Sequence, residues 1–484
     1  QEYCIPFVPC LKAWLRCRFQ RMLNVPQPRN TSNFAPSLAN FSVQYNLTSA
    51  SIAIAVLSNK QYLGRPLQKE PEWASDVTLG IAFVGTMIGM ACMGRLGDIL
   101  GRTKAMQVTL WFTAIGAIIP AVTVGPTAAF YGIICGGRLI LGIGVGGIYP
   151  LSAVSSAEGC RDAASRGNRV GQAFFWQIPG SIAPYLVAML LLSLMKPSKP
   201  AEWVPNVQFR LLFALGVLPV LVVILAALRE KDSEEFSARR NHQGIIEVAR
   251  SLPPQTWYTL AGTAGSWFTY DIAYYGTAIF TPQILDAICL TGVKKNGDCQ
   301  QTLFDISLES VIVTSFGIPG VALAIWLIKR WGCKRLNIVG FLFLIVNFAA
   351  LAVIFSVIPH QTPLLFGLFC TLNFGLQFGP NVGTFVLPAI CFPVHVRSTC
   401  HGLSATAGKI GAVVGTFMYP QIMQSTLGLP GVLWAASIFC ILGMVLSHCF
   451  LKNDWEYLED LDDRLAVESF VHGGHGGNAA QVQS

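Results

Sequence analysis

The sequence has little charge for its length. Asp, Glu, Lys and Arg make up 12% of the 484 residues and hydrophobic residues make up 53%, whereas soluble domains are about 25% charged. The mean hydropathy of +0.52 excludes an ordinary soluble protein. Long apolar runs predict membrane spans instead, because each spanning helix needs about 20 predominantly apolar residues.

The patterns expected of a metal site or an enzyme are also missing. The seven histidines are scattered singly, without the spacing of metal ligands, so we expect no metal and no other cofactor. No nucleophile-base pair or paired acids stand out, so the sequence does not indicate an enzyme. The basic residues follow loops between apolar runs, which does not indicate nucleic-acid binding.

About twelve apolar runs have a length that matches the thickness of a bilayer. They cover Ser37–Leu57, Val77–Met93, Ala105–Val124, Ala129–Ala153, Gln172–Leu194, Phe209–Leu228, Tyr258–Ile284, Leu308–Leu327, Leu336–Val357, Leu364–Ile390, Gly402–Ile422 and Val432–Leu451.

The loops differ in their basic residues, which predicts the orientation. Lys and Arg gather in 95–104, 161–169, 229–250 and 329–335, while 125–126, 359–363 and 426–430 have none. Basic loops stay on the cytoplasmic side, so both termini are expected there. We expect a plasma-membrane protein, with an organellar membrane as the alternative.

The charged connection that begins at Arg229 separates six runs from six, as a linker between transporter halves would. The expected organisation has five parts. These are a cytoplasmic amphipathic segment at 1–30, a six-helix half at 31–229, a cytoplasmic linker at 230–255, a second six-helix half at 256–452 and a cytoplasmic tail at 453–484.

An internal repeat supports this division. GRLGDILGRTK at 94–104 follows the second run and WLIKRWGCKR at 326–335 follows the eighth, so a basic-Gly-basic turn recurs at the same place in each half. The second copy has Lys329 where the first has Asp98.

The stretch GIGVGG at 142–147 matches G-x-G-x-x-G, but no strand precedes it, as a dinucleotide-binding loop would require. Gly142 and Gly146 are four residues apart, as are Gly132 and Gly136. Each pair is expected to form a smooth helical face on which a neighbouring span packs closely.

G-x-L-x-D-x-x-G-R-x-K at 94–104 and R-x-x-x-G-x-G-x-G at 138–146 resemble the major facilitator superfamily. The resemblance implies an all-α membrane protein with the twelve-helix major facilitator fold, in which two six-helix halves are related by pseudo-twofold symmetry. We expect Asp98 to accept hydrogen bonds from a helix N-terminus and to pair with Arg, latching one face. The expected gating and latch residues are Gly94, Asp98, Gly101, Arg102, Arg138 and Glu158.

Within that superfamily the chain resembles the inorganic phosphate:proton symporters, as a divergent member. The matching segments are GGIYPLSA at 146–153, GTAGSWFTYDIAYYG at 262–276, FGPNVGTFVLPAICFP at 378–393 and VRSTCHGLSATAGKIGA at 396–412. The resemblance implies a phosphate site made of Tyr149, Gln177, Trp267, Asp271, Tyr275, Asn381 and Lys409.

Physical chemistry points to two of these residues independently. Asp271 and Lys409 are charged residues inside apolar runs, where charge is costly and usually functional. Facing one cavity they would neutralise each other. Lys409 would meet the charge of phosphate and Asp271 would accept its O–H, which sulfate lacks. The alternative is a purely structural ion pair.

The chain departs from the family at acids expected to carry a coupling proton. Ile148, Ile390, Val43 and Asn46 stand at positions where the family commonly has carboxylates. None of these side chains titrates, so coupling would fall to Asp271, or a sodium ion would replace the proton. The coupling candidates are Asp271 and Asn46.

We therefore expect secondary-active or facilitative transport of inorganic phosphate by alternating access, with coupling to H⁺ or Na⁺. One alternative is a carrier of an organic phosphate or another organic solute. Another is a non-transporting, transporter-like subunit of a larger membrane assembly. The expected partners are phosphate and the lipid bilayer, and we expect a monomer, with a membrane-complex partner as the alternative.

Overall fold

The computed structural model describes most of the chain. The described residues are 33–58, 65–68, 71, 73–158, 160, 163–195, 201–233, 236–237, 250, 252–288, 293–295, 298–358 and 362–451. The amphipathic segment expected at 1–30, most of the linker and the tail expected at 453–484 lie outside them.

The N-terminal half consists of helices within its described residues. They are α2 (Phe34–Ser58), α3 (Ala74–Leu100), α4 (Arg102–Val122), α5 (Thr127–Ala157), α6 (Ala163–Phe175), α7 (Gln177–Leu194), α8 (Trp203–Ala214) and α9 (Val217–Ala227).

The C-terminal half adds one small hairpin to its helices. Its elements are α12 (Pro254–Ile288), β1 (Val293–Lys295), β2 (Asp298–Gln300), α13 (Leu303–Ser315), α14 (Gly317–Trp331), α15 (Cys333–Val357), α16 (Thr362–Gln377), α17 (Pro380–Ile390), α18 (Arg397–Gln424) and α19 (Gly428–Phe450). Strands β1 and β2 pair antiparallel.

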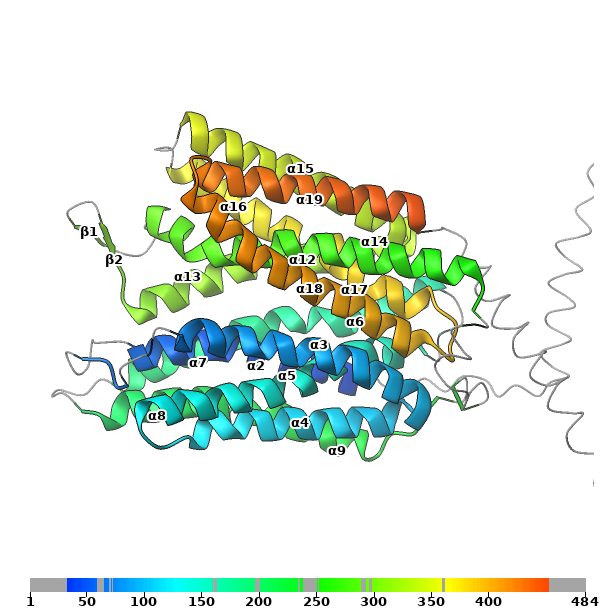
Figure 1. The fold of residues 1–484 in the computed structure, drawn as a ribbon, viewed down its shortest axis with the longest axis horizontal. Coiled ribbons are helices and arrows are strands. Elements are labelled where there is room, and N and C mark those ends of the chain that lie inside the picture. The colour runs from blue at the N-terminus through cyan, green and yellow to red at the C-terminus, as the bar shows by residue number, and fades with distance from the viewer. Residues whose placement is uncertain are drawn as a thin grey trace, which may run out of the picture.

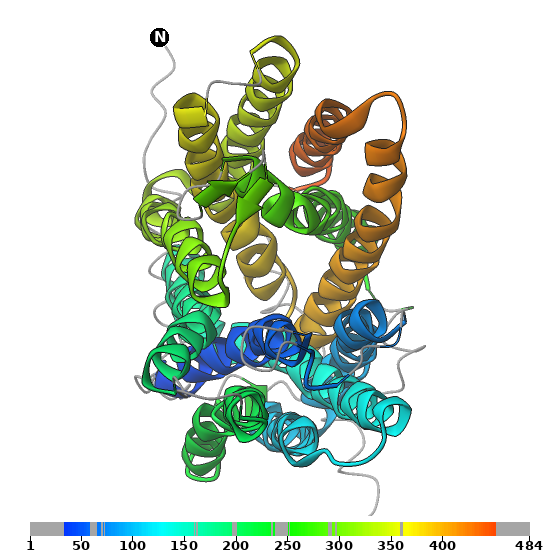
Figure 2. The same cartoon turned by 90° about the vertical axis from the view of Figure 1, so that its left-hand side faces the viewer.

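The two halves lie one above the other, with their helices running roughly along the same direction (Figure 1). Several helix pairs join the halves. At one side of the bundle α3 packs against α18, and at the opposite side α7 packs against α13, next to the contact between α6 and α14. The first two of these pairs can be followed in the end-on view of Figure 2. Interior side chains of both halves form one continuous apolar cluster, so the space between the halves is largely packed.

Eight spans in the described ranges are long and apolar enough to cross a membrane. Four expected runs are not among them, and they fall in α2, α12, α16–α17 and α18. These four runs contain several of the polar side chains described below, and α16 and α17 are also short, with 16 and 11 residues.

Four expected runs are interrupted rather than continuous. The breaks fall between α6 and α7, α8 and α9, α13 and α14, and α16 and α17. The last break contains Gly379 in a left-handed conformation, with φ 71°, followed by Pro380 at the first turn of α17. Hydropathy alone could not predict the first three interruptions, because apolar residues continue through them, whereas the Gly-Pro pair at the fourth is itself a turn signal.

The glycine pair in α5 packs as expected, but the other pair does not. A Cβ on Gly142 or Gly146 would lie 2.3 Å from the carbonyl oxygen of Ala82 or Thr86 in α3, so only glycine permits this approach. The expectation for Gly132 and Gly136 is wrong, because nothing lies within 4 Å of a Cβ at either position. Spacing alone did not show which face of α5 meets a neighbouring helix.

The internal repeat is visible in the backbone. Gly101 joins α3 to α4 with φ 104°, and Gly332 joins α14 to α15 with φ 76°. Both conformations favour glycine over residues with a side chain. The repeated basic-Gly-basic motif thus forms the same tight connection in each half.

Candidate functional site

Helices α12 and α18 of the C-terminal half pack together closely. A Cβ on Gly411 or Gly415 of α18 would lie 2.1 Å from the carbonyl oxygen of Phe268 or 2.6 Å from that of Ile272 in α12. Side chains at these two positions would hold the helices apart. The close approach places Asp271 within reach of α18.

Lys409 and Asp271 form a buried ion pair at this contact. Lys409 Nζ donates to Asp271 Oδ2 at 3.1 Å and to Tyr275 Oη at 2.7 Å. The Lys409 and Asp271 side chains are 3% and 4% exposed. Either charge alone would carry a large desolvation penalty, which the pairing offsets.

The ammonium group of Lys409 also faces the N-terminal half. It lies 5.7 Å from the ring centroid of Tyr149 in α5 and 5.9 Å from that of Phe83 in α3. Phe83 in turn meets the Tyr275 ring edge-on at 5.1 Å. Lys409 therefore lies between the two halves.

The N-terminal half contributes a chain of neutral hydrogen bonds. Gln177 Nε2 donates to Asn40 Oδ1 at 2.7 Å, and Gln44 Nε2 donates to Gln177 Oε1 at 2.9 Å. Gln44 also reaches Tyr149 Oη at 3.4 Å. Sequence reasoning missed Asn40 and Gln44, although their spacing of four residues on one face of a predicted helix was available as a signal.

An aromatic cluster adjoins these polar groups. Phe385 contacts Tyr149, Trp267 and His401 edge-on, with ring centroids 6.1, 6.4 and 5.4 Å apart. Trp267 also meets His401 at 5.7 Å. Trp267 thus forms an aromatic wall one turn from Asp271. His401 is fully buried within α18.

Asn381 lies in a separate amide pair on the C-terminal side. Its Nδ2 donates to Gln377 Oε1 at 2.5 Å, and Gln377 Nε2 reaches Tyr274 Oη at 3.4 Å. The Tyr274 ring meets the Tyr275 ring at 5.0 Å. Asn381 is therefore connected to the Lys409 cluster only through these neighbours, and Gln377 is a further polar residue that sequence reasoning missed.

Asp98 joins the halves at the end of the bundle where α3 meets α18. Asp98 Oδ2 accepts hydrogen bonds from the backbone N–H and the hydroxyl of Thr399, at 2.7 and 2.5 Å. Asp98 Oδ1 accepts from Ser398 N at 3.3 Å and pairs with Arg102 at 2.6 Å. These amides are in the first turn of α18, where a carboxylate also interacts favourably with the helix dipole.

Arg102 extends this cluster to α5. Its Nε donates to Glu158 Oε1 at 2.9 Å, and its Nη2 donates to the carbonyl oxygen of Val394 at 2.8 Å. A Cβ on Gly94 would lie 2.6 Å from the Ser398 carbonyl oxygen. Five of the six expected latch residues, Gly94, Asp98, Gly101, Arg102 and Glu158, thus lie at this end of the bundle.

Arg138 and Asn46 lie elsewhere. Arg138 Nη1 donates to the Asn46 carbonyl oxygen at 2.7 Å, and Arg138 Nη2 reaches that of Leu47 at 3.5 Å. The Asn46 side chain donates to the carbonyl oxygens of Ser42 and Gly216, at 2.9 and 3.0 Å. The structure therefore brings neither Arg138 to the Asp98 cluster nor the Asn46 side chain to the Lys409 cluster.

The positions where the resemblance implies additional acids are buried and apolar. Val43 and Ile148 are 0% exposed and Ile390 is 4% exposed. All three belong to the continuous apolar cluster of the two halves. Their surroundings are packed as a hydrophobic core.

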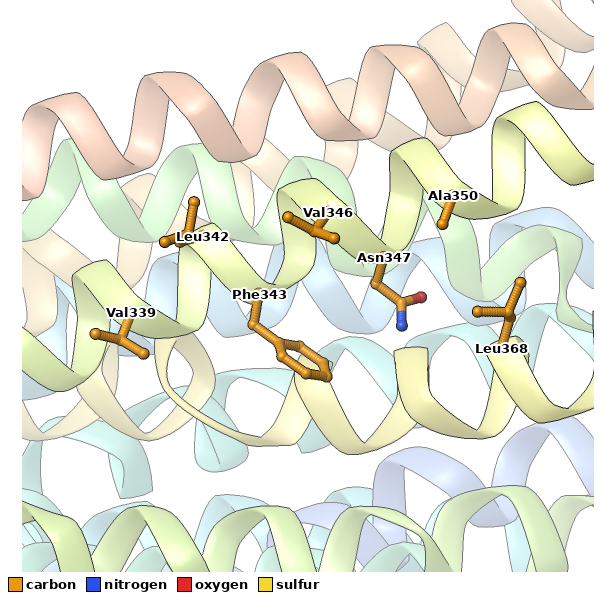
Figure 3. Close-up of a pocket in the computed structure, with 7 residues that line it drawn as sticks. All are labelled: Val339, Leu342, Phe343, Val346, Asn347, Ala350 and Leu368. Atoms are coloured by element: carbon orange, nitrogen blue, oxygen red, sulfur yellow. The ribbon is translucent and has the colours of Figure 1, made fainter.

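A pocket of about 350 Å³ lies away from the polar cluster, between α15 and α16 (Figure 3). Its lining is apolar apart from Asn347, whose Nδ2 donates to Thr371 Oγ1 at 2.7 Å. With no charged residue in its lining, this pocket lacks the chemistry expected of an anion site.

Comparison with protein families identifies the scaffold. The model of the sugar (and other) transporter family matches residues 33–244 and 290–453. The chain belongs to this family. It is therefore a multi-pass integral membrane protein and a transporter rather than an enzyme.

Several curated proteins are similar to this chain in sequence. The chain is 33% identical over 451 residues to inorganic phosphate transporter PT2 of Toxoplasma gondii, covering 90% of this chain and 73% of the relative. It is 29% identical over 444 residues to probable inorganic phosphate transporter 1-6 of Arabidopsis thaliana, covering 82% and 86%.

Solved structures of the major facilitator superfamily share the fold. The proton:xylose symporter XylE bound to 6-bromo-6-deoxy-D-glucose has a TM-score of 0.69 at 19% identity, covering 87% of this chain and 95% of XylE. The fucose:proton symporter FucP of Escherichia coli has a TM-score of 0.61 at 15% identity, covering 87% and 100%. The twelve-helix major facilitator fold expected from the sequence is thereby confirmed.

Proposed function

We propose that this family member transports inorganic phosphate by alternating access. The observation that carries the proposal is the buried Lys409, held by Asp271 and Tyr275 of its own half and facing Tyr149 of the other. The phosphate transporters among its sequence relatives support the same substrate.

The cluster offers complementary groups for a partly protonated phosphate. Lys409 can form a charge-assisted hydrogen bond to a phosphate oxygen. The Tyr275 and Tyr149 hydroxyls and the Gln177 amide are neutral donors. Asp271 can accept the phosphate O–H, and a fully deprotonated sulfate cannot supply that donor. Asn381 and Trp267 would complete the site as it rearranges around the anion.

The Asp98 cluster would hold one end of the bundle closed in this state. Opening that end requires Asp98 to release Thr399 and Ser398, and requires Arg102 to release Val394. Phosphate would then leave between α3 and α18, while the α7–α13 contact tightens. We assign gating roles to Gly94, Asp98, Gly101, Arg102 and Glu158 on this basis.

Coupling to an ion would depend on Asp271. A proton on Asp271 would weaken its hold on Lys409 and free the ammonium group for phosphate. A proton therefore suits this site as the coupled ion, with Na⁺ as the alternative. Asn46 is a weaker candidate because its amide hydrogens are already donated to two carbonyl oxygens.

We also propose the orientation and the boundaries given by the charge pattern. The end of the bundle with Asp98 and Arg102 would face the cytoplasm, together with both termini and the linker at 230–255. The halves would comprise residues 31–229 and 256–452, flanked by 1–30 and 453–484. The plasma membrane is the proposed location, and the protein would work as a monomer.

Phosphate counterflow in proteoliposomes tests the proposed function. The full chain should exchange labelled phosphate, and excess sulfate should compete poorly. Asp271→Asn should reduce this discrimination, because an amide can donate to a sulfate oxygen whereas a carboxylate cannot. Absence of phosphate binding by the parent protein would show that phosphate is not the substrate. Strong competition by glycerophosphodiesters would indicate an organic phosphate carrier instead.

Exchange measurements in imposed gradients test coupling separately. Proton coupling predicts that an inward pH gradient drives phosphate accumulation, and that Asp271→Asn retains counterflow but loses this accumulation. Accumulation driven by a sodium gradient would identify Na⁺ as the coupled ion. Phosphate uptake that is unaffected by the pH gradient and by the sodium gradient would indicate facilitated diffusion.

A further inference from the structure

Arg138 is a buried cation whose charge has no counter-charge in the described structure. It is 2% exposed, and the ion pairs found among the described residues do not include it. Two of its nitrogens contact carbonyl oxygens, while its Nε is buried without a hydrogen-bond partner. Carbonyl groups satisfy hydrogen bonds but do not neutralise a guanidinium, so burial remains costly.

The position of Arg138 relates it to the candidate site. Arg138 and Tyr149 are eleven residues apart on α5, which is about three helical turns and returns to the same face. The guanidinium reaches α2 at Asn46 and Leu47. Gln44, two residues before Asn46 on α2, contacts both Tyr149 and Gln177. Arg138 thus contacts α2, the helix that contributes Gln44 to the neutral hydrogen-bond chain.

We propose that Arg138 is a second cationic binding residue for the transported anion, contributed by the N-terminal half opposite Lys409. The inference rests on the proposed phosphate transport. A planar guanidinium can present two parallel N–H groups to phosphate oxygens. When phosphate arrives, Arg138 exchanges the neutral carbonyl oxygens of α2 for charged oxygens, and its Nε gains an acceptor.

In this proposal each half contributes one cation that binds the anion. Lys409 is already neutralised by Asp271, so its pairing must loosen for phosphate to bind. Arg138 has no such competitor among the described carboxylates and retains its full attraction for an anion.

Affinity measurements on the purified full chain test this inference with radiolabelled inorganic phosphate. Arg138→Gln should weaken phosphate binding by about tenfold or more, the range expected for hydrogen bonds to a charged group. Arg138→Lys keeps the charge but not the planar fork, so its loss should be smaller. Phosphate should also raise the unfolding temperature less in Arg138→Gln than in the parent.

Arg210→Gln is a matched control. Arg210 also donates to two helix carbonyl oxygens, those of Ala121 and Thr123, each at 2.7 Å. Arg210 belongs to α8, its guanidinium reaches the end of α4, and its Nε donates to Asn206 Oδ1 at 2.6 Å. Arg210→Gln should therefore change stability without changing phosphate affinity.

A second variant keeps the test valid if Arg138→Gln does not fold. Asn46→Asp retains the arginine and introduces a carboxylate on the residue whose carbonyl oxygen it contacts. The new acid should compete for the guanidinium and weaken phosphate binding. Parent-like affinity in whichever of these two variants folds would overturn the inference.

Lys409→Ala separates this inference from the proposed function. Loss of phosphate binding in Lys409→Ala but not in Arg138→Gln would still support phosphate transport. It would overturn the inference for Arg138, whose role would then be to hold α5 against α2. Absence of binding in the parent would overturn both proposals together.

Discussion

The two halves have the same architecture but contribute different chemistry to their shared interface. The C-terminal half provides a complete ion pair, Asp271 and Lys409. The N-terminal half provides a chain of neutral amides that ends at Tyr149, together with Arg138, for which no described carboxylate is a partner. Repetition therefore conserved the scaffold while the functional side chains diverged.

The same contrast holds at the paired turns of the repeat. Gly101 and Gly332 make equivalent connections. Before the first, Asp98 binds the opposite half through charged hydrogen bonds. Before Gly332, Lys329 stands at the position that corresponds to Asp98. The nearby contact between the halves is made by Asn168 of α6, which donates to the Ile325 carbonyl oxygen of α14 at 3.0 Å. One contact between the halves is made by a charged carboxylate, and its counterpart is made by a neutral amide.

The largest effect is expected at the ion pair. Lys409→Met leaves Asp271 buried without its counter-charge, which typically costs 3–5 kcal/mol, and it removes a proposed ligand of the anion. Phosphate counterflow should fall by about tenfold to a hundredfold, because a hydrogen bond to a charged group contributes about 1.5–3 kcal/mol.

The double variant Asp271→Asn/Lys409→Met distinguishes binding from stability. It should recover the unfolding temperature lost in Lys409→Met but not the counterflow. If the double variant transports phosphate like the parent, the ion pair has only a structural role. The two halves would then not differ in the way proposed in their contribution to anion binding.

The next largest effect is expected at Asp98. Asp98→Asn removes charge-assisted hydrogen bonds to the first turn of α18, each worth about 1.5–3 kcal/mol. The amides of Ser398 and Thr399 should exchange hydrogen at least about tenfold faster, which mass spectrometry of peptides from this region can measure.

Lys329→Asn is the matched control for Asp98→Asn. It changes the corresponding position of the other half, which has a lysine in place of the acid. Equal acceleration of amide exchange in both variants would show that Asp98 has no special role in closure.

A smaller effect is expected in the neutral chain. Gln44→Leu removes the link between Gln177 and Tyr149, and neutral hydrogen bonds contribute about 0.5–1.5 kcal/mol each. Phosphate affinity should fall by about two- to tenfold. A loss as large as that of Lys409→Met would mean that the N-terminal half is the dominant binding surface.

The smallest effect is expected at the neutral contact between α6 and α14. Asn168→Ala removes one hydrogen bond to a backbone carbonyl, so amide exchange at the start of α6 should rise by less than about tenfold. An effect exceeding that of Asp98→Asn would reverse the proposed order of the two contacts.

Sequence reasoning identified site residues best where a charged residue lies within an apolar run. Asp271 and Lys409 could be identified because charged residues are rare in spans, and their pairing follows the expectation of mutual neutralisation. Asn40, Gln44 and Gln377 were missed because amides are common packing residues in helices. Arg138 was grouped with the latch because it belongs to the motif, whereas its long side chain reaches another helix.

By itself, the sequence determined the number and length of the apolar runs, the division into two halves and the repeated glycine turns, because hydropathy and backbone freedom are local properties. Only the tertiary structure decided which face of α5 packs on α3, which helices are interrupted and which polar groups meet between the halves. Those outcomes depend on side chains from helices far apart in the chain, whose rotation and depth no single segment specifies.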